Sequence, residues 1–95
     1  MADQRTRQRW IFEGDVQGVG FRVTTREISA RFDLVGFVRN NVDGSVTVEA
    51  EGCTSALNGF LAEIKSRLTA RIEHCVWQDI ETQKPSNREA AFVIK

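Results

Sequence analysis

Apolar and polar residues alternate along the chain with two different periods, and these periods predict the order of the elements. Residues 7–14, "RQRWIFEG", mix aromatic and β-branched residues and end on a glycine, as is typical of a first strand. A helix is predicted next, because Phe21, Ile28 and Phe32 are spaced i, i+7 and i+11 and so share one helical face. The chain is therefore expected to open with a strand followed by an amphipathic helix.

The middle of the chain predicts a β-hairpin. "LVGFVRN" at 34–40 is a short strand of the buried type, and "SVTVEAE" at 45–51 alternates apolar and polar residues. "NNVDG" lies between them, with Asp43-Gly44 as the strongest turn element. Residues 34–51 are therefore predicted to form a hairpin.

The rest of the chain predicts a second helix and closing strands. Thr54 or Ser55 can cap the helix. Its apolar residues follow the spacing i, i+3, i+4, i+7 and i+11: Leu57, Phe60, Leu61, Ile64 and Leu68. Residues 71–82 predict a strand with ambiguous alternation, 84–90 a loop and 91–95 a closing strand.

The predicted order is β-α-β-β-α-β, with the last strand region open to division in two. Since both helices are amphipathic, we expect them to cover one face of an antiparallel sheet, which is the ferredoxin-like (split βαβ) arrangement of the α+β class. A polar N-terminal arm at 1–8 is expected before a single domain at 9–95. Many functions occur on this architecture, so the function has to be sought in a site.

Composition narrows the candidate functions. The 95 residues include 13 Lys plus Arg and 13 Asp plus Glu, so no net field attracts nucleic acid or a membrane surface. No apolar run approaches the roughly 20 residues of a membrane span, and the N-terminus lacks the apolar segment of a signal peptide. Cys53 and Cys75 do not make a disulfide framework, and the single His74 belongs to no metal-binding spacing. We expect a cytoplasmic monomer with no metal, membrane or nucleic-acid partner, in which any anion site is local.

The segment "EGDVQGVGFR" at 13–22 places three glycines between the first strand and the first helix. It is not a dinucleotide fingerprint, because Val23 occupies the position of the third glycine. It is not a P-loop, because no Lys-Ser or Lys-Thr pair follows the glycines. The cysteine that a phosphocysteine phosphatase needs six residues before the arginine is replaced by Val16.

The same segment nevertheless has the components of an anion site. Gly18 and Gly20 allow successive backbone N–H groups to converge on a ligand, and the helix that follows directs its positive end to the same place. Arg22 falls in the first helical turn, where an unpaired cation is disfavoured by about 0.3–1 kcal/mol. The alternative is a tight strand-to-helix connection with an exposed arginine, and the chemistry of the residues leaves both open.

Two stretches resemble the acylphosphatase family. "GDVQGVGFR" at 14–22 is similar to its phosphate-loop signature, and "LVGFVRNNVDGSVTVEAEG" at 34–52 to its strand-turn segment. The resemblance extends over the chain from about Arg9 onward. It implies a small ferredoxin-like enzyme that hydrolyses acyl phosphates to a carboxylate and inorganic phosphate, with no metal or cofactor and no covalent intermediate.

The resemblance also implies site residues. Arg22 and Asn40 match the catalytic arginine and asparagine of the family, with Asn40 orienting the attacking water. The residues that match the phosphate-binding loop are Asp15, Val16, Gln17, Gly18, Val19, Gly20, Phe21 and Arg22. Without the paired motif Asn40 would be assigned to the turn, where asparagine is favoured. The side chain of Gln17 is expected to brace the loop.

Three positions depart from the family pattern. Asp15 is acidic where many members carry a basic residue, Asp33 stands where glycine commonly ends the first helix, and Phe37 replaces a frequent tryptophan. None of these removes a catalytic group. We expect Trp10, Phe12, Phe21 and Phe37 to be core residues.

Two alternatives belong to other functional classes. One is a non-catalytic anion-binding or regulatory domain, of the kind found at the front of larger carbamoyl-transfer proteins. The other is an RNA-recognition domain of the same topology, which would carry exposed aromatic residues and a basic face on its central strands. "SVTVEAE" shows neither feature.

Overall fold

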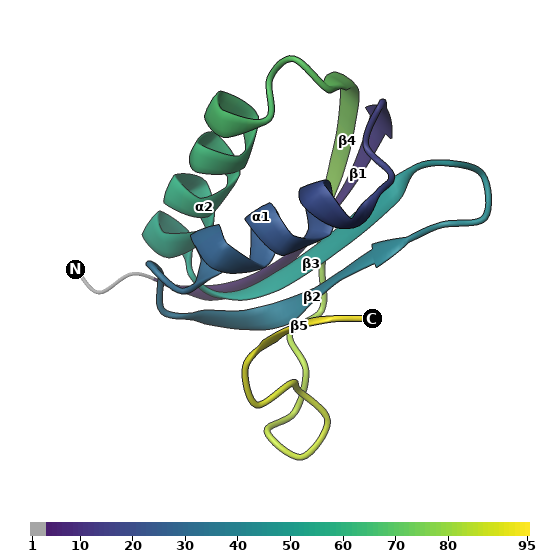
Figure 1. Cartoon of the computed structure of the whole chain (residues 1–95). Coiled ribbons are helices and arrows are strands. Elements are labelled where there is room, and N and C mark those ends of the chain that lie inside the picture. The colour runs from purple at the N-terminus through teal and green to yellow at the C-terminus, as the bar shows by residue number, and fades with distance from the viewer. Residues whose placement is uncertain (1–3) are drawn as a thin grey trace.

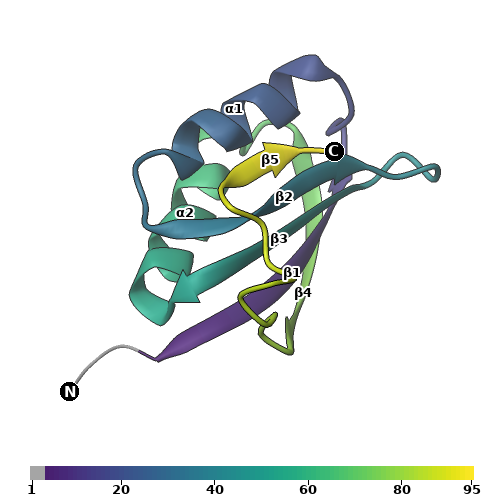
Figure 2. The ribbon, with the colours of Figure 1, turned by 90° about the horizontal axis from the view of Figure 1, so that it is seen from below.

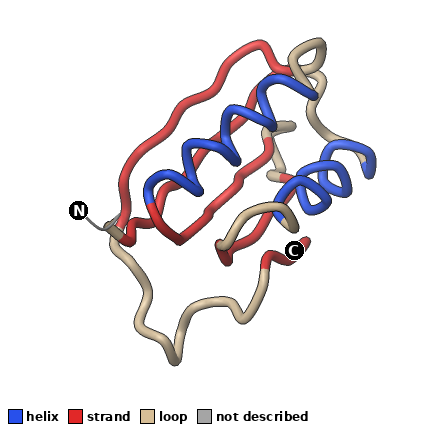
Figure 3. The backbone as a smooth tube through the Cα atoms, turned by 90° about the vertical axis from the view of Figure 1, so that its left-hand side faces the viewer, coloured by secondary structure: helices blue, strands red, loops and turns tan. Residues whose placement is uncertain are grey.

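Five strands and two helices form two layers in the computed structural model, which describes residues 4–95 (Figure 1). The elements are β1 (Arg5–Gly14), α1 (Val19–Ser29), β2 (Leu34–Asn40), β3 (Val46–Cys53), α2 (Thr54–Arg67), β4 (Ile72–Ile80) and β5 (Phe92–Ile94). The strand order across the sheet is β4-β1-β3-β2-β5. Both helices lie on one face of this sheet, as the views from below and from the side also show (Figures 2 and 3).

The predicted fold class and element order are confirmed, with the last strand region divided into β4 and β5. The sheet is antiparallel except at one edge, where β5 pairs with β2 in parallel, Phe37 lying opposite Val93. The reason is the connection at 81–91. It leaves β4 at one edge of the sheet and passes beneath the sheet to the other edge, so the chain enters β5 in the direction of β2 (Figure 1).

The core lies between the helices and the sheet. Strand alternation directs Trp10 and Phe12 of β1 toward the helices, and both are fully buried. The other fully buried apolar side chains are Val16, Phe21, Ile28, Val38, Val46, Val48, Ala50, Leu57, Phe60 and Ile64. Phe60 of α2 contacts Trp10 with ring centroids 5.6 Å apart. The predicted stripe of α2 is therefore the face that closes the core.

Phe37 is buried as predicted, but it points to the opposite face of the sheet. It pairs with Glu49 in the β2–β3 register, out of phase with the core residues. The ammonium of Lys95 lies 4.1 Å from the centroid of its ring, and the guanidinium of Arg39 lies 5.4 Å away. Cations near its ring, rather than the helices, therefore surround this aromatic side chain.

Charged side chains form a network of ion pairs on the sheet face that the helices leave open, with Arg7, Glu49 and Glu51 buried at its centre. We call them the ionic cluster: Arg5, Arg7, Arg9, Glu49, Glu51, Arg88 and Glu89. Arg7 lies at its centre, 2% exposed, with nitrogen atoms 3.1 Å from Glu49, 3.4 Å from Glu51 and 3.2 Å from Glu89. The backbone N–H of Gln83 donates to Glu51 at 2.9 Å. The cluster thereby fixes the 81–91 connection to the sheet.

The first strand begins at Arg5, inside the stretch that the sequence assigned to a polar arm. Residues 1–3 of that arm lie outside the described part of the chain. Arg5 and Arg7 pair in the antiparallel ladder with Cys53 and Glu51 of β3. Their polarity reflects ion pairing on a sheet face rather than solvation of a free arm.

Candidate functional site

The glycine-rich segment lies at the end of the sheet where β1 stops and α1 starts. β2 ends at the same end of the sheet (Figures 1 and 2), and Gln17 of the segment is hydrogen-bonded to Asn41, the residue after β2. Gly14 and Gly18 have φ angles of 129° and 126°, which L-residues with side chains rarely adopt. A Cβ on Gly14 would also lie 2.4 Å from the carbonyl oxygen of Arg71. A glycine is therefore required where β1 turns into the loop.

The N-terminus of α1 is uncapped and carries the positive end of the helix dipole. Gly18 is the N-cap, no side chain caps the first N–H groups, and the first turn contains no acidic residue. The first four N–H groups of a helix have no partner within the helix, and together with the dipole they favour an anion. The start of α1, which follows the loop directly, therefore favours a bound anion.

Arg22 and Asn40, the two predicted catalytic residues, lie on elements that meet at this end. Arg22 is in the first turn of α1, and Asn40 is the last residue of β2. Asn40 pairs with Val46, whose side chain belongs to the helix-covered core, so Asn40 lies on the same face as α1.

Both residues carry a buried polar atom without a hydrogen-bond partner. Four such side-chain atoms occur among residues 4–95, and two of them are Nε of Arg22 and Oδ1 of Asn40. Buried polar atoms are nearly always paired, so a coincidence at these two positions requires an explanation. A bound polar ligand between the helix start and the end of β2 would supply the missing partners.

Gln17 connects the loop to the β2–β3 hairpin. Its Nε2 donates to the carbonyl oxygens of Asn41, at 2.5 Å, and of Ser45, at 3.0 Å. The turn itself is held by the Asn41 N–H, which donates to the Ser45 carbonyl at 2.8 Å, and by the Asn41 amide, which donates to Thr47 at 2.7 Å. Since Asn41 follows Asn40 directly, these bonds fix the loop relative to Asn40.

The remaining predicted loop residues divide by exposure. Val16 and Phe21 are fully buried, and Phe21 packs on Phe12 with ring centroids 5.7 Å apart, which anchors the start of α1. Asp15 and Gly20 are exposed. Val19 begins α1, but its side chain lies outside what the structure describes.

One residue beside the loop was missed by sequence analysis. The backbone N–H of Asp15 donates to the carbonyl of Arg71 at 2.9 Å, so the segment before β4 lies against the loop. Nη1 of Arg71 is 3.4 Å from the position that a Cβ of Gly20 would take. No motif contains Arg71, and only the tertiary structure brings it here.

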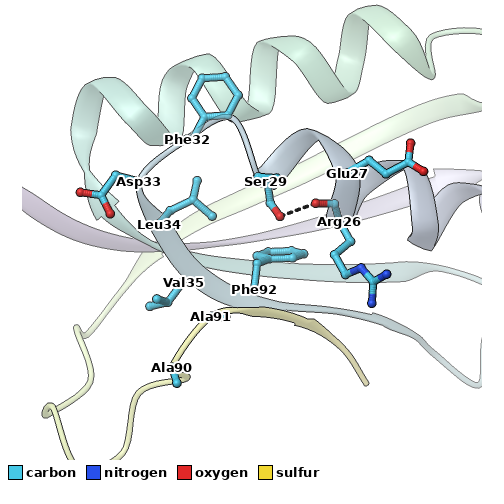
Figure 4. A pocket seen from close by; sticks show the side chains of 11 residues that line it. Arg26, Glu27, Ser29, Phe32, Asp33, Leu34, Val35, Ala90, Ala91 and Phe92 are labelled. Carbon is cyan, nitrogen blue, oxygen red and sulfur yellow. Dashed lines mark hydrogen bonds between the residues drawn. The ribbon is translucent and has the colours of Figure 1, made fainter.

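Two cavities lie away from the glycine-rich loop. A cavity of about 570 Å³ lies at the far end of α1, between that helix and the starts of β2 and β5; Phe32, Leu34 and Phe92 line it (Figure 4). Ser29 is also at its wall, but its hydroxyl already donates to the carbonyl of Arg26 at 2.5 Å. A second cavity of about 270 Å³ adjoins β4 near Lys65. Neither is lined by a residue of the glycine-rich loop.

Possible metal ligands and membrane-spanning helices were sought among the residues that the structure describes. Residues 4–95 contain no group of three or more His, Cys, Asp or Glu side chains placed to hold a metal ion. Neither α1 nor α2 is long and apolar enough to cross a membrane.

The family model and the related sequences that match this chain all name the same family. The family model described as acylphosphatase matches residues 8–94. The chain is 51% identical over 61 residues to an acylphosphatase of Salinibacter ruber and 50% identical over 83 residues to one of Thermotoga maritima. The second match covers 87% of this chain and 89% of the relative. The matched stretch is 64% of the Salinibacter protein and 62% of a Ligilactobacillus salivarius acylphosphatase, just under two thirds of each.

Solved structures give the same result. The acylphosphatase from Bacillus subtilis superposes with a TM-score of 0.81 at 27% identity, covering 97% of this chain and 99% of that one. Full-length HypF in its phosphate- and nucleotide-bound form superposes with a TM-score of 0.83 at 26% identity. That match covers the whole of this chain and only 12% of the HypF chain.

Proposed function

Because the chain belongs to the acylphosphatase family, we propose that it hydrolyses the carboxyl–phosphate bond of small acyl phosphates, releasing a carboxylate and inorganic phosphate. One observation links the proposal to particular residues of this chain. The unpaired buried atoms of Arg22 and Asn40 lie on elements that meet at the uncapped start of α1.

The loop and Arg22 are proposed to bind the phosphoryl group. Backbone N–H groups of residues 16–20 and of the first turn of α1 donate to its oxygens, whereas the N–H of Asp15 is already bonded to the carbonyl of Arg71. The guanidinium of Arg22 adds planar, two-point hydrogen bonding and neutralises charge as the bond to the carboxylate stretches. These groups are fixed before substrate arrives, so little reorganisation is needed during the reaction.

Asn40 is proposed to orient the attacking water. Its amide oxygen accepts a hydrogen bond from the water and holds it in line with the bond that breaks, without removing a proton. The carboxylate is a good leaving group, so no general acid is required, and the phosphoryl group itself accepts the proton of the water. Positioning and charge neutralisation then supply the acceleration.

The direct test is hydrolysis of benzoyl phosphate by the purified protein in the presence of a metal chelator. Asn40→Ala should lower kcat by roughly 10²-fold while the affinity for inorganic phosphate is largely kept, because the water and not the phosphoryl group loses its partner. Asn58→Ala, at an exposed position of α2, is the matched control. Turnover by Asn40→Ala at the parent rate would contradict the assignment.

A second variant tests the connection between the loop and the hairpin. Gln17→Ala should lower kcat roughly 10-fold, because the loop and Asn40 lose their fixed separation and small displacements are costly in catalysis. Gln17→Glu should be no better, since its carboxylate would face two carbonyl oxygens. The exposed Gln78→Ala provides the control in the same kinetic assay. Parent-like kinetics in both Gln17 variants would show that the connection has no catalytic role.

The alternative function is a phosphate-binding domain without turnover, and the likeness to HypF, solved in a phosphate-bound form, supports the phosphate binding. Such a domain would be protected against thermal unfolding by inorganic phosphate, and Arg22→Ala would remove the protection, yet no benzoyl phosphate would be consumed. The hydrolysis assay and the phosphate-dependent Tm, measured on the same preparation, therefore distinguish the two functions.

The proposal includes a monomeric, cytoplasmic protein that does not act on nucleic acid. All the proposed site residues come from one chain, and Cys53 and Cys75 are free thiols, as a reducing compartment favours. The arginines on the open sheet face are neutralised within the ionic cluster. They therefore do not form the basic, aromatic surface that RNA-recognition domains use.

A further inference from the structure

Arg71 is held against the glycine-rich loop by its backbone. Its carbonyl accepts from the N–H of Asp15 at 2.9 Å, and its own N–H donates to the carbonyl of Leu68 at 3.0 Å. The carbonyl oxygen is also the atom that a Cβ on Gly14 would meet at 2.4 Å. The segment between α2 and β4 is therefore packed on the loop, with Arg71 at the contact.

The guanidinium of Arg71 lies over the start of α1. Nη1 and Nη2 are 3.4 and 3.9 Å from the Cβ position of Gly20, the second residue of the helix. Arg71 is exposed and forms no ion pair within residues 4–95. A second unpaired cation thus lies at the positive end of a helix, where cations are disfavoured unless an anion lies between them and the dipole.

Arg22 and Arg71 differ in depth. Arg22 is half-buried and its Nε is inaccessible to solvent, whereas Arg71 is on the outside of the loop. A phosphoryl group bound by the loop and Arg22 therefore leaves Arg71 beside the part of the substrate that extends toward solvent, which is the acyl group. Two acidic side chains also lie near this rim. Asp15 is exposed and has no ion pair within the described chain, and Cγ of the exposed Glu73 is 3.1 Å from the position that a Cβ of Gly14 would take.

We infer that Arg71 is a specificity-determining residue that favours acyl phosphates whose acyl group carries a further negative charge. The inference rests on the proposed function. Arg71 would attract the second anionic group of the substrate and offset the repulsion from Asp15. Because the guanidinium is exposed, the preference is expected to be modest, roughly 3- to 5-fold, and to weaken at high salt.

Two substrates that differ by one charge test the inference: benzoyl phosphate and 4-carboxybenzoyl phosphate. For Arg71→Gln we expect kcat/KM to fall roughly 3- to 5-fold on the carboxylated substrate and clearly less on benzoyl phosphate. The comparison of variant with parent on each substrate removes the difference in intrinsic reactivity. Arg71→Lys should recover part of the loss, and about 0.5 M NaCl, which screens exposed charge pairs, should reduce the parent's preference.

Arg67→Gln is the matched control, because Arg67 is exposed at the end of α2 and lies outside the proposed site. It should leave the ratio of the two kcat/KM values unchanged. Equal losses on both substrates in Arg71→Gln would overturn the inference, since Arg71 would then act on the phosphoryl group or the loop. So would unchanged kinetics on both. A parent protein that hydrolyses neither substrate would instead contradict the proposed function.

Discussion

Arg22→Ala is expected to lower kcat/KM for benzoyl phosphate by roughly 10³-fold, the largest effect on activity that this structure predicts. The side chain is the cation in the first turn of α1, and its buried Nε has no partner among residues 4–95. Removing it deletes both a two-point hydrogen bond and a neutralising charge from the phosphoryl site. Steady-state kinetics give the loss in turnover, and titration with inorganic phosphate should show weaker binding as well.

Arg22→Lys separates charge from geometry. The lysine ammonium keeps the charge but not the planar pair of donors, so we expect it to recover only about 10-fold of the lost activity. The Tm of both variants should stay close to that of the parent, because Nε makes no hydrogen bond within the described chain. Parent-like hydrolysis by Arg22→Ala would show that the phosphoryl site lies elsewhere.

The largest effect on stability is expected for Glu51→Gln, which should lower the free energy of unfolding by about 3 kcal/mol. Glu51 is fully buried within the ionic cluster, 2.8 Å from Arg5 and 3.4 Å from Arg7. When one partner of a buried ion pair is neutralised, the other charge stays buried without full compensation. The free-energy cost of this exceeds what the intact pair contributes to stability. Urea unfolding at neutral pH, followed by circular dichroism, measures the change.

The same carboxylate predicts how stability depends on pH. Burial alone would raise the pKa of Glu51, but the N–H of Gln83 and the guanidinium groups of Arg5 and Arg7 outweigh it, so the pKa lies below its ordinary 4.5. Because the unfolded chain binds this proton more readily, the contribution is complete above about pH 4.5 and is lost as the pH falls through the lowered folded-state pKa. The difference between the parent and Glu51→Gln should therefore shrink in acid.

Glu63→Gln is the control for a surface pair. Glu63 and Arg31 are 3.0 Å apart, but their side chains are 33% and 63% exposed. We expect a change within about 1 kcal/mol at any pH, as for most exposed ion pairs. If Glu51→Gln were as mild as this control, the ionic cluster would not stabilise the fold in the way proposed here.

The periodic segments were predictable because each has one apolar face that packs on the core. The stripe of α2 and the alternation of β1 and β3 follow directly from which residues must leave water, and the structure buries Phe60, Trp10 and Val48 accordingly. In polar segments the sequence does not indicate which residues are buried. Arg5 and Arg7 resemble a solvated arm until Glu51 is placed opposite them, and that pairing depends on residues more than 40 positions away.

For the candidate site, the chemistry of the residues left the role of Arg22 open and favoured a turn role for Asn40, and the resemblance of two motifs singled both residues out. The structure adds what neither motif contains. Gln17 bonds to carbonyls 24 and 28 residues further along, and Arg71 comes to the loop through the packing of the segment before β4. Contacts of this kind depend on tertiary geometry and leave no periodicity or spacing in the sequence.

The partners of Arg7 in the ionic cluster are synthesised at different times. Arg7 and Glu89 are 82 positions apart. A chain growing from its N-terminus would therefore carry Arg7 and the two β3 glutamates long before Glu89 is made, and β5 later still. Until then one edge of β2 lacks its parallel neighbour and is free to pair with another strand. Synthesis of Glu89 and then of β5 thus completes both the charge balance of the sheet and the protection of this edge.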